Sequence, residues 1–240
     1  MNSADILNSF LDSLVINKKC SQNTLSAYRR DIQSFFEYVS FKGIEFSDAT
    51  QNDILEYKNF MTESGKSSST VSRTMSSLRS FYKYLVTVSV CDANPAVKIR
   101  NDKLDKKYFE ILSEGEIDTL LSIPDSGTYK GKRDKAILET LYATGLKVSE
   151  LISLNVYDFN AKMGCIKCNA EKSRVILLYP TAVKAINDYL NSSRIYYVSG
   201  SDEEALFVNT NGERMTRQGL WKLIKHYADN AGINKSITTY

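Results

Sequence analysis

Hydrophobic side chains in the first 90 residues recur every three or four positions, the spacing that places them on one face of an α-helix. Four stretches carry this pattern, and Ser3, Ser21, Thr50 and the serines of residues 67–69 stand where N-terminal caps belong. The predicted helices cover residues 4–16, 22–39, 51–61 and 70–86. Because each apolar face needs a partner surface, four such helices joined by short loops predict an all-α bundle.

This pattern breaks at Asn94-Pro95. The residues that follow, 95–108, are polar and charged and lack a clear period, as expected of a connection between domains. We therefore expect a first domain over residues 1–94, a linker over residues 95–108 and a second domain over residues 109–240. With 240 residues, of which 42% are hydrophobic, the chain can form two such cores.

The second domain mixes helical and β periods. Ser113 and Glu116 have the spacing of a capping box, and Gly145 stands where a left-handed residue would end a helix. Two β-rich runs flank a short polar turn and predict a hairpin over residues 164–179. Helices are expected over residues 114–123, 133–144, 181–197 and 217–232, and a further short strand over residues 205–209. The predicted fold class is α+β, mainly helical, with a small antiparallel sheet.

The positions of the charges say more than their totals, because 31 Lys+Arg against 28 Asp+Glu leave a net charge of only +3. Residues 66–107 hold nine basic and three acidic residues. In the second and fourth predicted helices, Arg alternates with Ser and Thr opposite the apolar face, which suits a close approach to a phosphate backbone. We therefore expect double-stranded DNA as the partner; a basic face that binds nothing is the alternative. The predicted contacts in this domain are Thr24, Arg29, Arg30, Arg73, Ser76, Arg79 and Lys83, and Ser77 is expected on the same face.

In the second domain, Arg217 follows Thr216 at the start of a predicted helix, where backbone N–H groups favour anions. These two residues and Arg174, in the predicted hairpin, are therefore further predicted DNA contacts. Trp221, one turn beyond Arg217, is expected in the core.

Cys165 and Cys168 have the spacing of a metal-binding pair, but the chain has a single histidine and no second pair at a zinc-like distance. We therefore expect buried thiols, no metal and no cofactor. A run of about 18 apolar residues, which a membrane-spanning helix needs, is absent from the sequence. The chain is accordingly expected to be a cytoplasmic protein that contacts no membrane.

The stretch "RDKAILETLYATGLKVSELISLNVYDF", residues 133–159, resembles the first conserved box of the Xer-type tyrosine recombinases of the phage integrase family, which cut and rejoin DNA strands through a phosphotyrosine. The similarity extends along the chain through "NTLSAYRRDIQSFFEY", "VSRTMSSLRSFYKYL", "NPA" and "MTRQGLWKLIKHYADNAGI". It implies a helical core-binding (SAM-like) DNA-binding domain followed by a catalytic-type domain, acting in DNA recombination or integration. It also implies assembly on DNA with another recombinase protomer of the same or a different kind.

Three active-site positions depart from the family pattern. After "TGL" the family has an arginine that binds the scissile phosphate, and this chain has Lys147. Lysine keeps the charge but lacks the two-pronged contact, at a cost of about 3 kcal/mol in transition-state stabilisation. Lys172 is the candidate for the family's general-acid lysine, in a hairpin turn two residues shorter than the family's. Tyr240 stands near the first histidine of the family's second box, too early to be the nucleophile.

The leading hypothesis is a DNA-binding protein of the tyrosine recombinase family that lacks the tyrosine nucleophile and belongs to a domain incomplete at its C-terminus. It would be either a fragment of a strand transferase or a decayed relative that binds DNA without cutting it. The alternative is a catalytically inactive protein-interaction module that pairs with an active recombinase or another protein.

Overall fold

The computed structural model describes residues 2–18, 20–100, 110–169 and 173–235. The chain divides into two compact units, residues 1–107 and 108–240, and each unit is described by itself. The expected fold class is confirmed, because one unit is a helical bundle and the other a mainly helical α+β domain with a three-stranded antiparallel sheet. No helix in the described part of the chain is long and apolar enough to cross a membrane.

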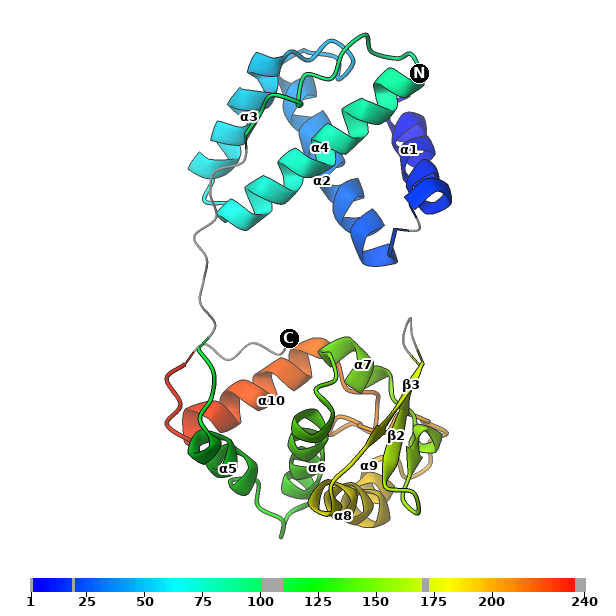
Figure 1. The fold of residues 1–240 in the computed structure, drawn as a ribbon, viewed down its shortest axis with the longest axis vertical. Helices are drawn as coiled ribbons and strands as arrows, with labels where there is room; N and C mark the ends of the chain where they lie inside the picture. Colours follow the sequence, from blue (N-terminus) through cyan, green and yellow to red (C-terminus); the bar gives the residue numbers. More distant parts are fainter. Residues whose placement is uncertain (1, 19, 101–109, 170–172, 236–240) are drawn as a thin grey trace. The chain divides into compact units, whose positions relative to one another are not determined.

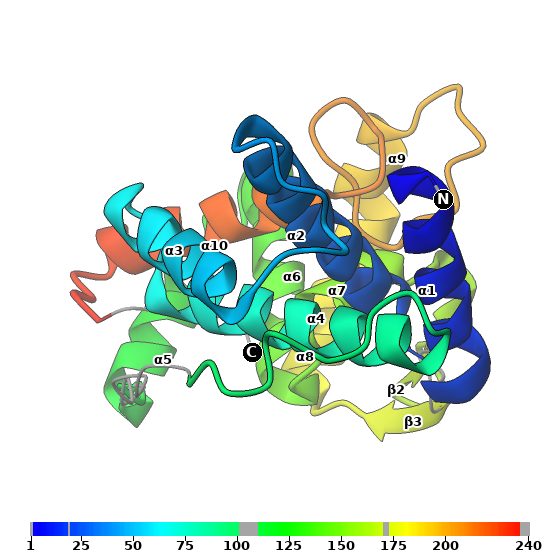
Figure 2. The same ribbon diagram turned by 90° about the horizontal axis from the view of Figure 1, so that it is seen from above.

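Four helices form the first unit: α1 (Ser3–Lys18), α2 (Gln22–Phe41), α3 (Gln51–Glu63) and α4 (Ser68–Thr87). The expected caps are confirmed for three of them, since the side chains of Ser21, Thr50 and Ser67 accept a backbone N–H at the starts of α2, α3 and α4. The long helices α2 and α4 pack against each other and cross in both views (Figures 1 and 2). Their contact is the centre of the unit.

Aromatic side chains fill the core of this unit. Phe10, Phe35 and Phe81 are completely or almost completely buried and lie within 5.4 Å to 6.1 Å, centroid to centroid, of other core rings. Tyr82 is buried as well, and its hydroxyl donates to the Phe46 carbonyl at 2.7 Å, which satisfies its polar group. The helical spacing of the apolar residues therefore predicted the core faces of these helices.

The segment predicted as a linker begins as part of the bundle. Ala96 and Ile99 are buried in the first unit's core, and the Arg79 guanidinium donates to their carbonyl oxygens at 3.4 Å and 3.2 Å. Ala96 and Ile99 therefore pack on the helices, while Val97, Lys98 and Arg100 of the same segment are exposed. Residues 101–109 lie outside the described part of the chain.

The second unit begins with α5 (Glu114–Ser122), α6 (Tyr129–Thr144), α7 (Val148–Ser153) and the short 3-10 turn η1 (Val156–Asp158). The sheet follows, with β1 (Phe159–Asn160), β2 (Cys165–Cys168) and β3 (Arg174–Leu177) in the order β1-β2-β3. The predicted hairpin is confirmed, since Cys165 pairs with Leu177 and Cys168 with Arg174. The chain continues through α8 (Pro180–Asp188), the π-helical η2 (Tyr189–Arg194), α9 (Ile195–Tyr197) and α10 (Arg217–Asn230). In Figure 1, α6 lies in the middle of this unit.

The strand predicted over residues 205–209 is not formed. Ala205 and Val208 make only isolated bridges, to Asn155 and Arg214. This apolar run is instead buried among helices, where its backbone finds single partners such as the Leu154 carbonyl, which accepts from the Leu206 N–H at 2.9 Å. A short, fully apolar run does not distinguish a strand from a buried connecting segment.

Candidate nucleic-acid interface

The corner between α6 and α7 positions Lys147. Gly145 ends α6 in the left-handed conformation, with φ 59°, and its N–H donates to the Leu141 carbonyl at 2.9 Å, as its sequence position predicted. Leu146 is buried and anchors the turn, whereas Lys147, the residue before α7, is exposed in an extended conformation. The glycine thus turns the chain so that one residue enters the core and the next reaches the surface.

The start of α10 provides the second part of the site. The Thr216 side chain accepts the Gly219 N–H at 3.0 Å and caps the helix, and Arg217 is its first residue. Thr216 was predicted as a DNA contact; the structure gives its hydroxyl a capping role. The first-turn N–H groups and the exposed Arg217 side chain make this end of α10 electropositive.

Lys147 and Arg217 line one cavity of 460 Å³, which Lys222 also lines. The remaining lining residues are Val148, Ser149, Gln218 and Trp221, so the described lining contains three cations and no carboxylate. Such a cavity suits an anion such as a backbone phosphate. Sequence reasoning missed Lys222, although its place one turn after Gln218 on the predicted helix could have indicated it.

Trp221 was expected in the core, but it is 50% exposed, and the prediction was wrong. It follows the buried Leu220 on α10 and is one of the residues that line the cavity. The Lys225 ammonium lies 5.4 Å from the ring centroid, an arrangement favoured by the negative face of the indole. An aromatic surface therefore stands beside the three cations.

Glu150 connects the corner to the hairpin. Its carboxylate accepts the Lys147 backbone N–H at 3.0 Å and two N–H groups of Arg174 at 3.0 Å and 2.8 Å. The hydrogen bonds from Arg174 lower the pKa of Glu150 below its ordinary value. Arg174, predicted as a DNA contact, thus uses one edge of its guanidinium to hold β3 against the start of α7.

The predicted contacts of the first unit divide into exposed and anchored residues. Arg30 and Lys83 are exposed, and Arg29 is exposed with one N–H donated to Asn8 at 3.0 Å. Thr24 lies in the capped first turn of α2, and the Ser76 hydroxyl donates to the Ser72 carbonyl at 2.9 Å within α4. Arg79 holds residues 96 and 99, as described above, so its main contacts are structural.

Ser77 was expected on the exposed face of the fourth helix, but it is completely buried. Its hydroxyl donates to Asp31 at 2.7 Å, and Arg73 donates to the same carboxylate oxygen at 2.7 Å. The crossing of α2 and α4 brings Asp31 to this side of α4, which the sequence pattern of one helix could not show. Arg73 and Ser77 are therefore joined by a buried acid.

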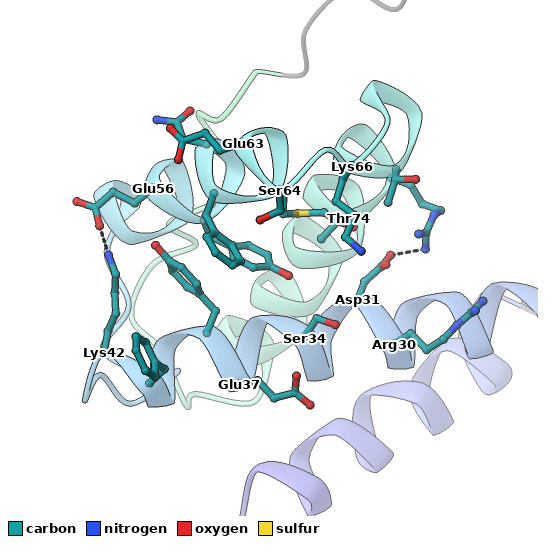
Figure 3. A pocket seen from close by; sticks show the side chains of 18 residues that line it. Arg30, Asp31, Ser34, Glu37, Lys42, Glu56, Glu63, Ser64, Lys66 and Thr74 are labelled. Atoms are coloured by element: carbon teal, nitrogen blue, oxygen red, sulfur yellow. Dashed lines mark hydrogen bonds and ion pairs between the residues drawn. The ribbon is translucent and has the colours of Figure 1, made fainter.

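A groove of 1190 Å³ lies between α2, α3 and the start of α4 in the first unit (Figure 3). Lys42 pairs with Glu56 at one end, and Arg30, Asp31 and Lys66 lie toward the other. Aromatic side chains also line the groove, including Tyr38, Tyr57 and Phe60. The lining as a whole carries four basic and four acidic residues, namely Arg30, Lys42, Lys66 and Arg73 with Asp31, Glu37, Glu56 and Glu63.

Two predicted catalytic residues, Lys172 and Tyr240, lie outside the described residues. Among the predicted sites that are described, the structure brings Lys147 and Arg217 together at one cavity and places Arg30 and Arg73 at one groove.

Comparison with known proteins gives a consistent result. Residues 110–240 match the phage integrase family, and residues 7–88 match the N-terminal SAM-like domain of phage integrases. Tyrosine recombinase XerD of Oceanobacillus iheyensis is 39% identical over 236 residues, which are 96% of this chain and 79% of the relative. Tyrosine recombinase XerC of Roseiflexus sp. is 35% identical over 237 residues, 96% of this chain and 76% of the relative.

The fold has solved counterparts as well. The crystal structure of a lambda integrase dimer bound to a COC′ core site has a TM-score of 0.68 at 14% identity, over 97% of this chain and 79% of that chain. This likeness shows the two-unit fold. Because both units match the family and its Xer members exceed 30% identity over most of their length, the chain belongs to the phage integrase family of tyrosine recombinases.

Proposed function

We propose that this chain binds double-stranded DNA and holds one backbone phosphate in the cavity between α7 and α10. The observation that carries the proposal is the gathering of Lys147, Arg217 and Lys222 around one cavity without a carboxylate in its described lining. Three cations and the electropositive end of α10 together replace the counterions that a phosphate would otherwise retain. The lambda integrase of similar fold is described in complex with a DNA core site.

A further part of the proposal is that residues 1–240 bind DNA without forming a covalent phosphotyrosine bond. It is supported by Lys147, which stands where the family's arginine binds the scissile phosphate with two parallel hydrogen bonds. A lysine gives the same charge from a flexible stem but lacks the planar pair of parallel donors, so it suits binding better than transition-state stabilisation. Incubation with a nicked suicide duplex should yield no denaturation-resistant complex, and a trapped covalent complex would contradict this part.

Fluorescence anisotropy with a labelled duplex tests DNA binding directly. The complex should weaken steeply as salt is raised, because its main contribution is counterion release. The double substitution Lys147→Ala with Arg217→Ala should weaken binding at least tenfold. It should also reduce the slope of the logarithm of the binding constant against the logarithm of the salt concentration by the contribution of about two phosphate contacts. Lys184→Ala is the matched control, since Lys184 is exposed on α8 and lies outside the cavity lining. Salt-independent binding, or none at low salt, would contradict the proposal.

A protein-interaction module is the second candidate function, and the groove of the first unit favours it. Phe41 and Phe60, which line the groove, are 92% and 50% exposed, and these aromatic side chains together with the paired Lys42 and Glu56 suit a protein partner. Sedimentation of the chain with a purified active tyrosine recombinase in the absence of DNA would test this function. A complex that Phe60→Ser weakens, while DNA binding is unchanged, would support it.

A further inference from the structure

The polar end of the groove contains an acid among basic residues. Arg30, Lys66 and Arg73 line this end together with Asp31 (Figure 3). A carboxylate beside three cations opposes the attraction of an anion, so a surface selected only for positive charge would not contain it. The position of Asp31 therefore calls for a physical explanation beyond net charge.

Asp31 is buried, with 7% of its side chain exposed. One of its oxygens accepts both the Arg73 Nη1–H and the Ser77 hydroxyl at 2.7 Å. Ser77 is completely buried in α4, and its hydroxyl also lies 3.2 Å from the Arg73 carbonyl. The carboxylate is thus fixed by one donor from the core and one from the surface.

Arg73 is the surface donor, and only part of its guanidinium is used. Its side chain is 43% exposed, and Nη1 is the one guanidinium nitrogen with a partner among the described residues. The remaining N–H groups are therefore free to meet a ligand. Because the guanidinium is planar, fixing Nη1 against Asp31 also fixes the direction of those donors.

We propose that Asp31 is a positioning residue for DNA binding, which holds Arg73 so that its free N–H groups, with Arg30 and Lys66, contact a second backbone phosphate. This inference rests on the proposed DNA-binding function and adds a contact in the first unit. An arginine on the surface of a helix otherwise loses side-chain entropy when it binds, and the buried carboxylate removes much of that cost in advance. Asp31 itself need not touch the DNA.

The substitution Asp31→Asn separates positioning from electrostatics, because the two predict opposite signs. Removing a negative charge near the site should tighten binding if the acid acts only through its charge. If Asp31 positions Arg73, the variant should bind duplex DNA about fivefold more weakly. The slope of the logarithm of the binding constant against the logarithm of the salt concentration should also fall by the contribution of about one phosphate contact. Glu37→Gln is the matched control: Glu37 is an exposed carboxylate of α2 that lines the same groove, and its neutralisation should leave binding equal or tighter.

Anisotropy titrations of the full chain with one duplex, at several salt concentrations, give each outcome a meaning. If the unaltered chain shows no salt-dependent binding, the proposed function itself fails. If it binds and Asp31→Asn binds equally well or more tightly, the positioning role alone is overturned. Weaker binding by Asp31→Asn together with unchanged or tighter binding by Glu37→Gln supports it.

Circular dichroism establishes whether Asp31→Asn folds. Should it not fold, Ser77→Ala replaces it, because this change removes the buried donor that fixes the carboxylate while leaving Arg73 and Asp31 in place. Ser77→Ala should bind duplex DNA two- to threefold more weakly, although the variant keeps every basic side chain of the unaltered chain. Binding identical to that of the unaltered chain would overturn the proposal. Arg73→Lys, which keeps the charge but loses the planar geometry, should reproduce the weaker binding of Asp31→Asn.

Discussion

The groove of the first unit and the cavity of the second hold their cations in different ways. At the groove of the first unit, Arg73 is fixed by a buried side chain, Asp31. At the cavity of the second unit, Lys147 and Arg217 take their places from the backbone, one after a left-handed glycine and the other after a helix cap. Side-chain anchoring couples a surface cation to the stability of the core. Backbone positioning leaves the cation itself free to change at little cost to folding.

The largest expected effect separates these two kinds of anchoring. Arg73→Ala leaves the Asp31 carboxylate buried with Ser77 as its remaining partner, so we expect a loss of about 2 kcal/mol in the free energy of unfolding, less than for a fully buried pair because Arg73 is partly exposed. Arg217→Ala, at an exposed position without an ion pair in the described structure, should change it by less than about 0.5 kcal/mol. Urea unfolding followed by circular dichroism measures both. Equal losses of unfolding free energy in the two variants would contradict the distinction between side-chain anchoring and backbone positioning.

The same result bears on DNA-binding experiments. Because Arg73→Ala and Arg79→Ala both remove contacts within the first unit, weaker DNA binding by either variant would not show a phosphate contact by itself. Substitutions at Lys147 and Arg217 avoid this difficulty.

The next effect concerns the backbone that positions Lys147. Gly145→Ala should destabilise the second unit by about 1 kcal/mol, since the residue has φ 59° and an added Cβ would meet no other atom, so the cost is conformational. DNA binding should weaken as well if the corner shifts. Gly115→Ala is the control, because Gly115 lies in α5 with ordinary φ and equally open surroundings, and alanine there should be neutral or slightly stabilising. Thermal unfolding of the two variants provides the comparison.

Sequence patterns predicted what depends on neighbouring residues. Helix faces, the caps at Ser21 and Thr50, the left-handed Gly145 and the hairpin all follow from local spacing, and the structure confirms them. The pairing of Lys147 with Arg217 is different, because these residues are 70 positions apart and meet only through the packing of α7 on α10.

The predictions that the structure corrects also concern contacts between elements that are distant in the sequence. Ser77 has a small polar side chain at a position that reads as surface, yet it is buried because α2 crosses α4 at that turn and presents Asp31. Ala96 and Ile99 read as part of a charged linker, but they find an apolar surface on the bundle. A periodicity describes one element, whereas these contacts depend on how two elements meet.

A smaller effect sharpens the comparison at the cavity. Lys147→Arg should tighten binding to duplex DNA about threefold, because a guanidinium can place two parallel hydrogen bonds on one phosphate where an ammonium places one. Stability should be unchanged, since the position is exposed and its backbone makes the contact with Glu150. Anisotropy at fixed salt measures the change, with Lys184→Arg on α8 as the control. Weaker binding by the arginine variant would mean that the cavity is shaped for the lysine.

The smallest effect concerns Arg174, a cation of the second unit that Glu150 anchors. Its hydrogen bonds to Glu150 lower the pKa of that carboxyl from an ordinary 4.5, so the folded chain binds this proton less readily than the unfolded chain. The contact between Arg174 and Glu150 therefore stabilises the folded chain above pH 4.5, and this stability is lost as the pH falls through the lowered pKa of Glu150. Glu150→Gln should lower the unfolding temperature slightly at pH 7, and the difference from the unaltered chain should shrink below pH 4.5. If the difference persisted at pH 3, Glu150 would stabilise the corner chiefly through its shape and neutral hydrogen bonds, and the hairpin would be held independently of charge.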